Sequence, residues 1–218
     1  RFDTPNNVDS VQYALAVRRL LYKYFQMIST TNGAAGGNFP GLPELQDPAR
    51  IINAGGGALT MNHLNMAYNK VTDNNGRPNA IMGNSRALRT FMDTHYVRGF
   101  QPEYIMSEYD DPIQGKVMAK IACLHGTPFY INDLIPTSEG PPATTQIYFM
   151  VFGDNNSSGP GRGITGICPS RLLGNMFVRR EVMQYNKATT AVQVTWPVGL
   201  AMGSKGALSS VTNFLLRD

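Results

Sequence analysis

The sequence predicts a mixed α/β or α+β protein, and three stretches lead to this prediction. Apolar residues recur at three- and four-residue steps over 8–28, which is typical of a long amphipathic helix. Residues 146–152 are apolar almost throughout, as expected of a strand covered on both faces. Residues 192–198 alternate between apolar and polar side chains, which indicates a half-buried strand. With 218 residues and 42% hydrophobic content, the chain is long enough to bury a sizeable core around such elements.

The helix expected over 8–28 has recognisable start and stop signals. Asp9 is the expected N-cap, and Gln12 three positions later can complete a capping box. Asn32 and Gly33 are expected to end the helix, because both residue types tolerate the left-handed conformation. The apolar face is expected to consist of Ala14, Val17, Leu21, Tyr24 or Phe25, and Ile28.

A glycine-rich segment, TTNGAAGGNFPGLPEL over 30–45, follows this helix and raises the question of a phosphate site. A Walker-type phosphate loop needs a strand before its glycines and a helix after them, with Gly-Lys-Ser/Thr at the junction. Here the helix comes first, and that tripeptide is absent. A second candidate, GSKG over 203–206, fails because its serine precedes its lysine. Both segments are therefore interpreted as connectors.

The central part of the chain predicts helices and strands in alternation. One helix is expected to begin at Thr60, and another after a cap at Asn84 or Ser85. The expected bounds are a helix over 59–71, a turn at 73–76, a strand at 80–82, a helix through 87–92, strands at 117–124 and 129–135 joined by a turn at 125–128, and a strand at 163–167 as a short partner of 146–152. The strands on either side of the 125–128 turn are expected to form a hairpin.

Trp196 is expected in the core, on the apolar face of the alternating strand, and Pro197 pushes that strand towards a sheet edge. Because an indole buries up to roughly 250 Å², Trp196→Ala is expected to cost about 3–5 kcal/mol.

Composition favours a neutral polar surface that suits contact with other proteins. Charged residues make up 16%, below the roughly 25% typical of soluble domains, and 22 glycines and 14 prolines indicate many loops. The net charge is +4, but the basic residues are scattered, with Arg18-Arg19 and Arg179-Arg180 as the only adjacent pairs. These pairs are interpreted as a solvated helix face and as a strand or turn edge. No zinc finger, basic zipper or aromatic RNA-binding signature indicates a dedicated nucleic-acid reader.

Cysteine usage and hydropathy bear on the compartment. Cys123 and Cys168 are too few for the disulfide framework of a small secreted protein, so synthesis in a reducing compartment is expected. The longest apolar run, 147–152, is far shorter than the roughly 20 residues of a membrane helix, so no membrane partner is expected. No signal peptide is visible, and because the chain begins with Arg1, an upstream segment is expected.

Candidate chemistry is sparse. The three histidines, His63, His95 and His125, are far apart in the sequence and form no HExxH pair, so no metal site is expected. No Gly-x-Ser-x-Gly segment indicates a hydrolase either. A carboxylate cluster could hold a cation or act as an acid and base pair, but its Asp-Pro step favours a solvated acidic loop. The cluster consists of Glu103, Glu108, Asp110 and Asp111. The sequence therefore predicts no enzyme, with no catalytic, cofactor-binding or metal-binding residues and no cofactor.

Several segments form a recognisable set when taken together and in order. The first is YKYFQMI over 22–28, followed by Asn32-Gly33 and by FPGL over 39–42. The others are PNAIMGNSRALRTFM (78–92), LHGTPFYINDLIP (124–136), TQIYFMVFGD (145–154) and VQVTWPVGLAMGSKGALSSVTNF (192–214). This set resembles motifs of the major capsid proteins of tailed phages, which share the Hong Kong 97-type shell fold. The first segment is similar to the end of that family's long spine helix and the loop after it.

This resemblance implies an α+β fold with a spine helix in a peripheral domain, and an axial domain of sheet flanked by helices. It divides the chain into a peripheral domain at 1–34, an axial domain at 35–168, return strands of the peripheral domain at 169–198 and a closing axial segment at 199–218. The family's N-terminal arm and extended loop are then expected upstream, and because they reach neighbouring subunits, this chain alone is expected to remain a small species.

The resemblance also implies a function. The chain would be a structural subunit of an icosahedral phage or prophage capsid, self-assembling into pentamers and hexamers around double-stranded DNA, with non-specific DNA contact and no small-molecule substrate. It would be made in the bacterial host cytoplasm and end in the virion. Two alternatives stay open, which are the shell of an encapsulin-type compartment, built on the same fold, and an α/β enzyme with a cryptic site.

Overall fold

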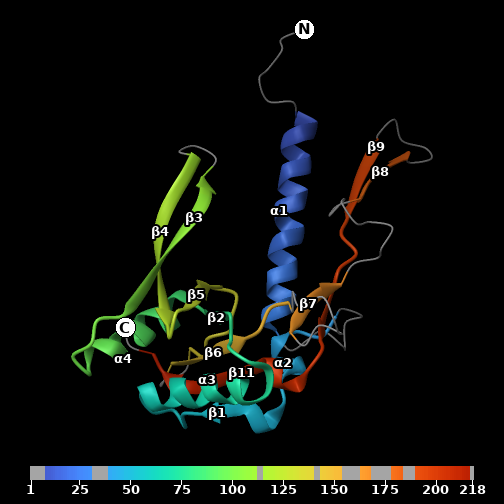
Figure 1. Cartoon of the computed structure of the whole chain (residues 1–218). Coiled ribbons are helices and arrows are strands. Elements are labelled where there is room, and N and C mark those ends of the chain that lie inside the picture. The colour runs from blue at the N-terminus through green and yellow to red at the C-terminus, as the bar shows by residue number, and fades with distance from the viewer. Residues whose placement is uncertain are drawn as a thin grey trace.

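The structure, a computed structural model, describes residues 8–30, 39–111, 115–139, 143–153, 163–167, 178–183 and 190–216. It contains a seven-stranded sheet of order β1-β11-β6-β2-β5-β4-β3, whose strands other than β3 and β4 form the base. Helix α1 (Val8–Ser29) and two hairpins, β3–β4 and β8–β9, project from this base in roughly the same direction, with α1 between the hairpins (Figure 1). The helices of the base are α2 (Leu42–Leu45), α3 (Met61–Asn75) and α4 (Ser85–Tyr96).

The sheet is mixed. Strands β1 and β11 run parallel, as do β2 and β5, while the other neighbouring pairs are antiparallel. Its strands are β1 (Ile51–Asn53), β2 (Ala80–Gly83), β3 (Glu103–Asp111), β4 (Gly115–Leu124), β5 (Thr127–Ile131), β6 (Thr144–Met150) and β11 (Leu208–Leu215). Two small antiparallel ribbons complete the fold, β7 (Ile164–Ile167) with β10 (Gly199–Met202), and β8 (Val178–Met183) with β9 (Thr190–Thr195).

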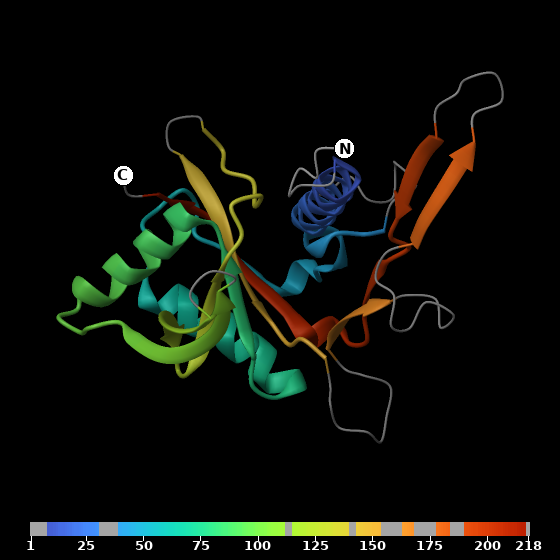
Figure 2. The same cartoon turned by 90° about the horizontal axis from the view of Figure 1, so that it is seen from above.

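Strand β6 is buried on both faces, as its apolar sequence predicts. Ile147 and Phe149 face the cluster formed with α3 and α4, where Leu64 and Phe91 are fully buried. The alternate residues face a second cluster that includes the base of α1, α2 and β10, and its buried members include Ile28, Leu42, Tyr148, Met150 and Leu200. Figure 2 shows α3 and α4 on one side of the central strands and α1 with α2 on the other.

The helix signals are confirmed in part. Thr60 caps α3 by accepting from the backbone N–H of His63 at 3.3 Å, and Asn84 caps α4 by accepting from that of Ala87 at 2.7 Å. Asp9 is not the N-cap of α1, because the helix already begins at Val8. The turn expected at 73–76 is also wrong, since α3 continues to Asn75 and ends at Gly76, whose φ is 78°. The stop expected at Asn32-Gly33 lies outside the described residues.

The β4–β5 hairpin is confirmed, but its turn is shorter than expected. His125 and Gly126 both have positive φ, 50° and 74°, and this pair alone connects the strands, as in a two-residue hairpin loop. The partner expected for 163–167 is wrong, because β7 pairs with β10 rather than with β6. Strand β7 meets the segment that follows β6 through an isolated bridge between Phe152 and Ile164.

Trp196 does not lie in the sheet core, which corrects its expected placement. Strand β9 ends at Thr195, and the half-buried indole of Trp196 packs on α1 with its centroid 4.7 Å from the ring of Tyr24. Phe39 contacts the same tyrosine ring at 5.5 Å. The indole therefore joins the β8–β9 ribbon to α1 and fills no central position.

The cost of Trp196→Ala is accordingly expected to be about 2 kcal/mol, below the value for a fully buried aromatic residue. Trp196→Phe keeps a ring against Tyr24 and should cost less than about 1 kcal/mol. Urea unfolding followed by circular dichroism measures both, and a loss of about 4 kcal/mol or more for the alanine variant would restore the core placement.

Burial of Tyr148 predicts a loss of stability at alkaline pH. Its side chain is fully buried on β6, and this burial raises the pKa of its phenol above the ordinary value of 10.0. The unfolded chain ionises this phenol near pH 10 while the folded chain does not, so its contribution is intact below about pH 10 and is lost progressively above it. The free energy of unfolding of Tyr148→Phe should therefore decline less steeply between about pH 10 and 11 than that of the wild type, and equal slopes would contradict the assignment.

Candidate functional surfaces

The histidines do not converge on one site. His95 is buried in α4, where Nδ1 lies 3.0 Å from the backbone O of Phe91. His125, in the β4–β5 turn, lies 3.1 Å from Oδ1 of Asn65 through Nε2, while His63 is in the first turn of α3. Within the described part of the chain, no three His, Cys, Asp or Glu residues are grouped so as to hold a metal ion.

The carboxylate cluster is part of a strand, which corrects its interpretation as an acidic loop. Glu103, Glu108, Asp110 and Asp111 all belong to β3, which pairs with β4 over its nine residues. Five positions separate Glu103 from Glu108, so the two side chains point to opposite faces, roughly 16 Å apart along the strand. Glu103 and Glu108 therefore do not form an acid and base pair.

Cys123 is buried beside this strand. Its Sγ lies 3.9 Å from Oε2 of Glu103, and the backbone N–H of Gly126 donates to the same carboxylate oxygen at 3.4 Å. Burial and the Glu103 charge both raise the pKa of the Cys123 thiol, which makes it a poor nucleophile. Cys168 lies outside the described residues.

The second phosphate-loop candidate is a connector. Ser204 caps a short 3₁₀ helix at Lys205–Ala207 by accepting from the backbone N–H of Gly206 at 3.2 Å, and this turn leads from β10 into β11. Of the first candidate, residues 31–38 lie outside the described part, and Leu42–Leu45 forms α2.

The motif-like segments supply polar contacts that hold the fold together. Asp133 accepts from the backbone N–H and the hydroxyl of Ser85, at 2.7 and 2.6 Å, and so fixes the start of α4. Asn132 donates to the hydroxyl of Ser29 at 2.9 Å, which ties the end of β5 to the last turn of α1. Asn84 donates to Thr145 at 2.9 Å in addition to capping α4. These roles are structural.

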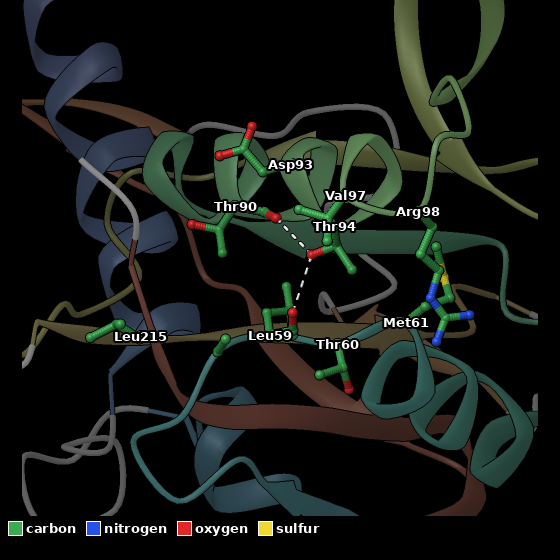
Figure 3. Close-up of a pocket in the computed structure, with 10 residues that line it drawn as sticks. Leu59, Thr60, Met61, Thr90, Asp93, Thr94, Val97, Arg98 and Leu215 are labelled. Atoms are coloured by element: carbon green, nitrogen blue, oxygen red, sulfur yellow. Dashed lines mark hydrogen bonds between the residues drawn. The ribbon is translucent and has the colours of Figure 1, made fainter.

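A small pocket lies between the start of α3 and the C-terminal half of α4 (Figure 3). Its volume is about 210 Å³, below the roughly 300–1,000 Å³ of typical ligand sites. The Thr94 hydroxyl lies at its centre and donates to the backbone O of Thr90 at 2.8 Å. Asp93 and Arg98 line different sides of the pocket and form no convergent charged pair there (Figure 3).

Exposed apolar side chains occur on the projecting elements as well as on the base. Helix α1 and the β3–β4 hairpin expose several each, and a groove of about 650 Å³ separates α1 from β5 and the ends of β2 and β6. The exposed apolar residues of these two projections are Val11, Leu15, Tyr22 and Phe25 on α1, and Tyr104, Met106 and Met118 on the hairpin. Sequence periodicity indicates an apolar face on α1 but gives no sign that a second one stays uncovered.

The arginine pairs lie where the sequence predicts. Arg18 and Arg19 are both exposed on α1, and Arg179 and Arg180 belong to strand β8. In the described part of the chain, no helix is both long enough and apolar enough to span a membrane.

Comparison with known proteins places this architecture. No family model matches the sequence, and no curated protein matches it significantly. The structure matches the cryo-EM structure of the holo-SrpI encapsulin complex from Synechococcus elongatus PCC 7942 with a TM-score of 0.80 and 18% identity, over 100% of this chain and 69% of that chain. The chain has the Hong Kong 97-type fold.

A crystal structure of a phage-related protein from Bordetella bronchiseptica RB50 also matches, with a TM-score of 0.48 and 11% identity over 95% of this chain and 66% of that chain. The assignment to the Hong Kong 97-type fold depends on the encapsulin match alone.

Proposed function

We propose that this chain is a structural subunit of a closed protein shell, which assembles from copies of itself in pentamers and hexamers. The observation that carries the proposal is the match of the whole chain to an encapsulin at a TM-score of 0.80. Large apolar side chains exposed on both α1 and the β3–β4 hairpin support it, because extensive exposed apolar surface marks sites of protein contact. The proposal assigns no catalytic residue, cofactor or substrate.

The proposed division into domains separates α1 and the β8–β9 ribbon from the rest of the chain. Residues 1–34 and 169–198 would form the peripheral domain, and residues 35–168 and 199–218 the axial domain. The contact between Trp196 and Tyr24 supports grouping the β8–β9 ribbon with α1. The seven-stranded sheet with α3 and α4 would form the body of the axial domain.

The proposed content of the shell is double-stranded DNA, in the virion of a phage or prophage. A net charge of +4 from scattered basic residues suits weak, sequence-independent contact with phosphates. An encapsulin-type compartment that encloses protein is the second candidate, because the matched structure is that of an encapsulin complex. The two candidates share a fold and differ in what is enclosed.

Electron microscopy of the natural gene product, purified from its host, tests the shell proposal. Closed hollow particles of uniform diameter are the expected result, and a strictly monomeric protein across several salt concentrations would contradict it. Nucleic acid that survives nuclease treatment of intact particles would identify a capsid. A stoichiometric second protein inside particles free of nucleic acid would identify a compartment.

A further inference from the structure

The β3–β4 hairpin, here called the arm, is joined to the rest of the sheet by a narrow joint (Figure 1). Its two strands pair with each other over all nine residues of β3. By contrast, two residue pairs connect β4 to β5, namely Cys123 with Pro128 and Leu124 with Thr127. The joint is buried, whereas no described side chain of β3, or of β4 before Ala122, is buried.

The turn at this joint contains a strained residue. His125 has a φ of 50° and Gly126 has one of 74°, so both residues lie in the left-handed region. Glycine and asparagine adopt this conformation at low cost, and Asn-Gly is a preferred pair in a two-residue hairpin turn. A histidine at the first position costs backbone free energy that an asparagine would save. The reason for a histidine at position 125 therefore lies in its side chain.

The side chain of His125 reaches from the turn to helix α3. Its Nε2 lies 3.1 Å from Oδ1 of Asn65, and because an amide oxygen only accepts, Nε2 carries the proton and donates it. The imidazole also meets the ring of Tyr68 edge to face, with the centroids 5.1 Å apart and 77° between the planes. Arg77 donates through Nε to the hydroxyl of Tyr68 at 3.0 Å, which holds the tyrosine ring in position.

The two ends of the turn are held by different contacts. On the β5 side, the hydroxyl of Thr127 donates to the backbone O of Pro78 at 2.9 Å in a buried hydrogen bond, so β5 stays attached to the base. On the arm side, the backbone N–H of Gly126 donates to Oε2 of Glu103 at 3.4 Å, which ties the turn to the start of β3. The hydrogen bond from the turn to α3 is exposed, and exposed hydrogen bonds open more readily than buried ones.

We infer that the arm is hinged at the two-pair joint, and that His125 is the latch that fixes its direction relative to α3. The contacts of the imidazole with Asn65 and Tyr68 hold the joint at one angle. The nine residues of β3 span about 27 Å, so a swing of about 10° moves the tip of the arm by about 5 Å. The exposed side chains of Met106 and Met118 move with the arm, so the latch sets where this apolar surface stands. The inference goes beyond the proposed function and does not depend on assembly.

His125→Asn separates the latch from the turn, because it favours the two-residue turn while removing the ring that contacts Tyr68. Spin labels on unnatural residues in place of Met118 and Asn62, both exposed, measure the distance from the arm to α3 and leave the two cysteines unchanged. Dilution into unlabelled protein keeps the measured distances within one chain. The wild type should give one narrow distance distribution, and His125→Asn should broaden it by about 5 Å or more.

Hydrogen exchange at the amides of Leu124 and Thr127 gives a second measurement of the joint. Loss of one hydrogen bond should raise their exchange rates about two- to ten-fold in His125→Asn. Asn65→Ala keeps the imidazole on Tyr68, so it should change both measurements in the same direction and by less. The matched control is His63→Asn, in the first turn of α3, where the histidine forms no hydrogen bond to the turn in the described part of the chain. This control should leave both measurements unchanged.

The midpoint of global urea unfolding should not fall in His125→Asn, which shows that any broadening arises at the joint and not from loss of the fold. Should it fall, Asn65→Ala decides, because that variant removes one hydrogen-bond acceptor and leaves the turn intact. An unchanged or narrower distance distribution in both variants, which is what a better turn alone predicts for His125→Asn, would overturn the inference. A wild-type distribution as broad as that of His125→Asn would overturn it as well. Either result leaves the shell proposal standing, since the distances are measured within one chain.

Discussion

Replacing Phe149 by alanine is expected to lower the free energy of unfolding by about 3–5 kcal/mol. The phenyl ring is fully buried near the end of β6, on the face that packs against α3 and α4. Its removal deletes apolar contacts and leaves a cavity in the cluster that holds Phe91 and Ile81, which also are fully buried. Domains of this size are stable by only about 5–15 kcal/mol, so the variant would be close to unfolding at room temperature.

The matched control is Phe100→Ala. Phe100 is 67% exposed beyond the end of α4, so its truncation should change stability by less than about 0.5 kcal/mol. Urea unfolding of both variants, followed by circular dichroism, gives the comparison. Similar losses for the two phenylalanines would show that β6 is not buried on the face that packs against α3 and α4.

The elements that the sequence predicts well are those with local signals. Strand β6 is recognisable because burial on both faces requires an unbroken apolar run, and Thr60 and Asn84 are recognisable because capping depends on neighbouring residues alone. Strand β3 is missed because the hairpin stands away from the body of the sheet. Its exposed Met106 and Glu108 give it no clean alternation of apolar and polar residues.

The order of strands in the sheet could not be derived from the sequence. Strand β11, at the end of the chain, lies between β1 and β6, and these pairings join segments that are far apart in the sequence. The placement of Trp196 failed for a related reason. Its alternating strand does exist, but it belongs to a two-stranded ribbon rather than to the sheet, so the alternation indicates packing on α1 and not a central position.

The candidate surfaces were harder to predict than the fold. Periodicity shows that α1 has apolar residues, but whether each side chain is exposed depends on which other elements pack on the helix. The exposure of Tyr22 and Phe25 becomes evident only in the structure, where Tyr24 on another face of α1 packs on Trp196. The family resemblance implied the fold correctly and suggested self-assembly, yet it indicated nothing about the β3–β4 hairpin. A contact between copies is a property of two molecules, so no local pattern in one chain specifies it.

Gly41→Ala is expected to cost about 2–3 kcal/mol. Gly41 has φ of −80° and ψ of 176°, which any residue can adopt, so its backbone conformation does not require glycine. The lack of space around Gly41, however, does require a glycine. A Cβ atom there would lie 2.4 Å from the backbone O of Thr30 and 2.6 Å from that of Met27, at the end of α1. Backbone atoms cannot rotate away, so either α1 or the segment leading into α2 must shift.

This shift should be visible in assembly as well as in stability. The clash lies where α1 joins the base, and a small tilt there is amplified along a 22-residue helix, so the far end of α1 would move most. Trp196 is the only tryptophan and packs on Tyr24, so its fluorescence should change in Gly41→Ala. The matched control is Gly166→Ala, where a Cβ atom meets nothing within 4 Å and stability, fluorescence and shell yield should all stay unchanged. If α1 presents the surface that a second subunit covers, Gly41→Ala should reduce shell yield under conditions where the folded fraction remains high. Normal shells combined with unchanged fluorescence would show that the joint tolerates the extra carbon and that the close approach at Gly41 does not fix the direction of α1.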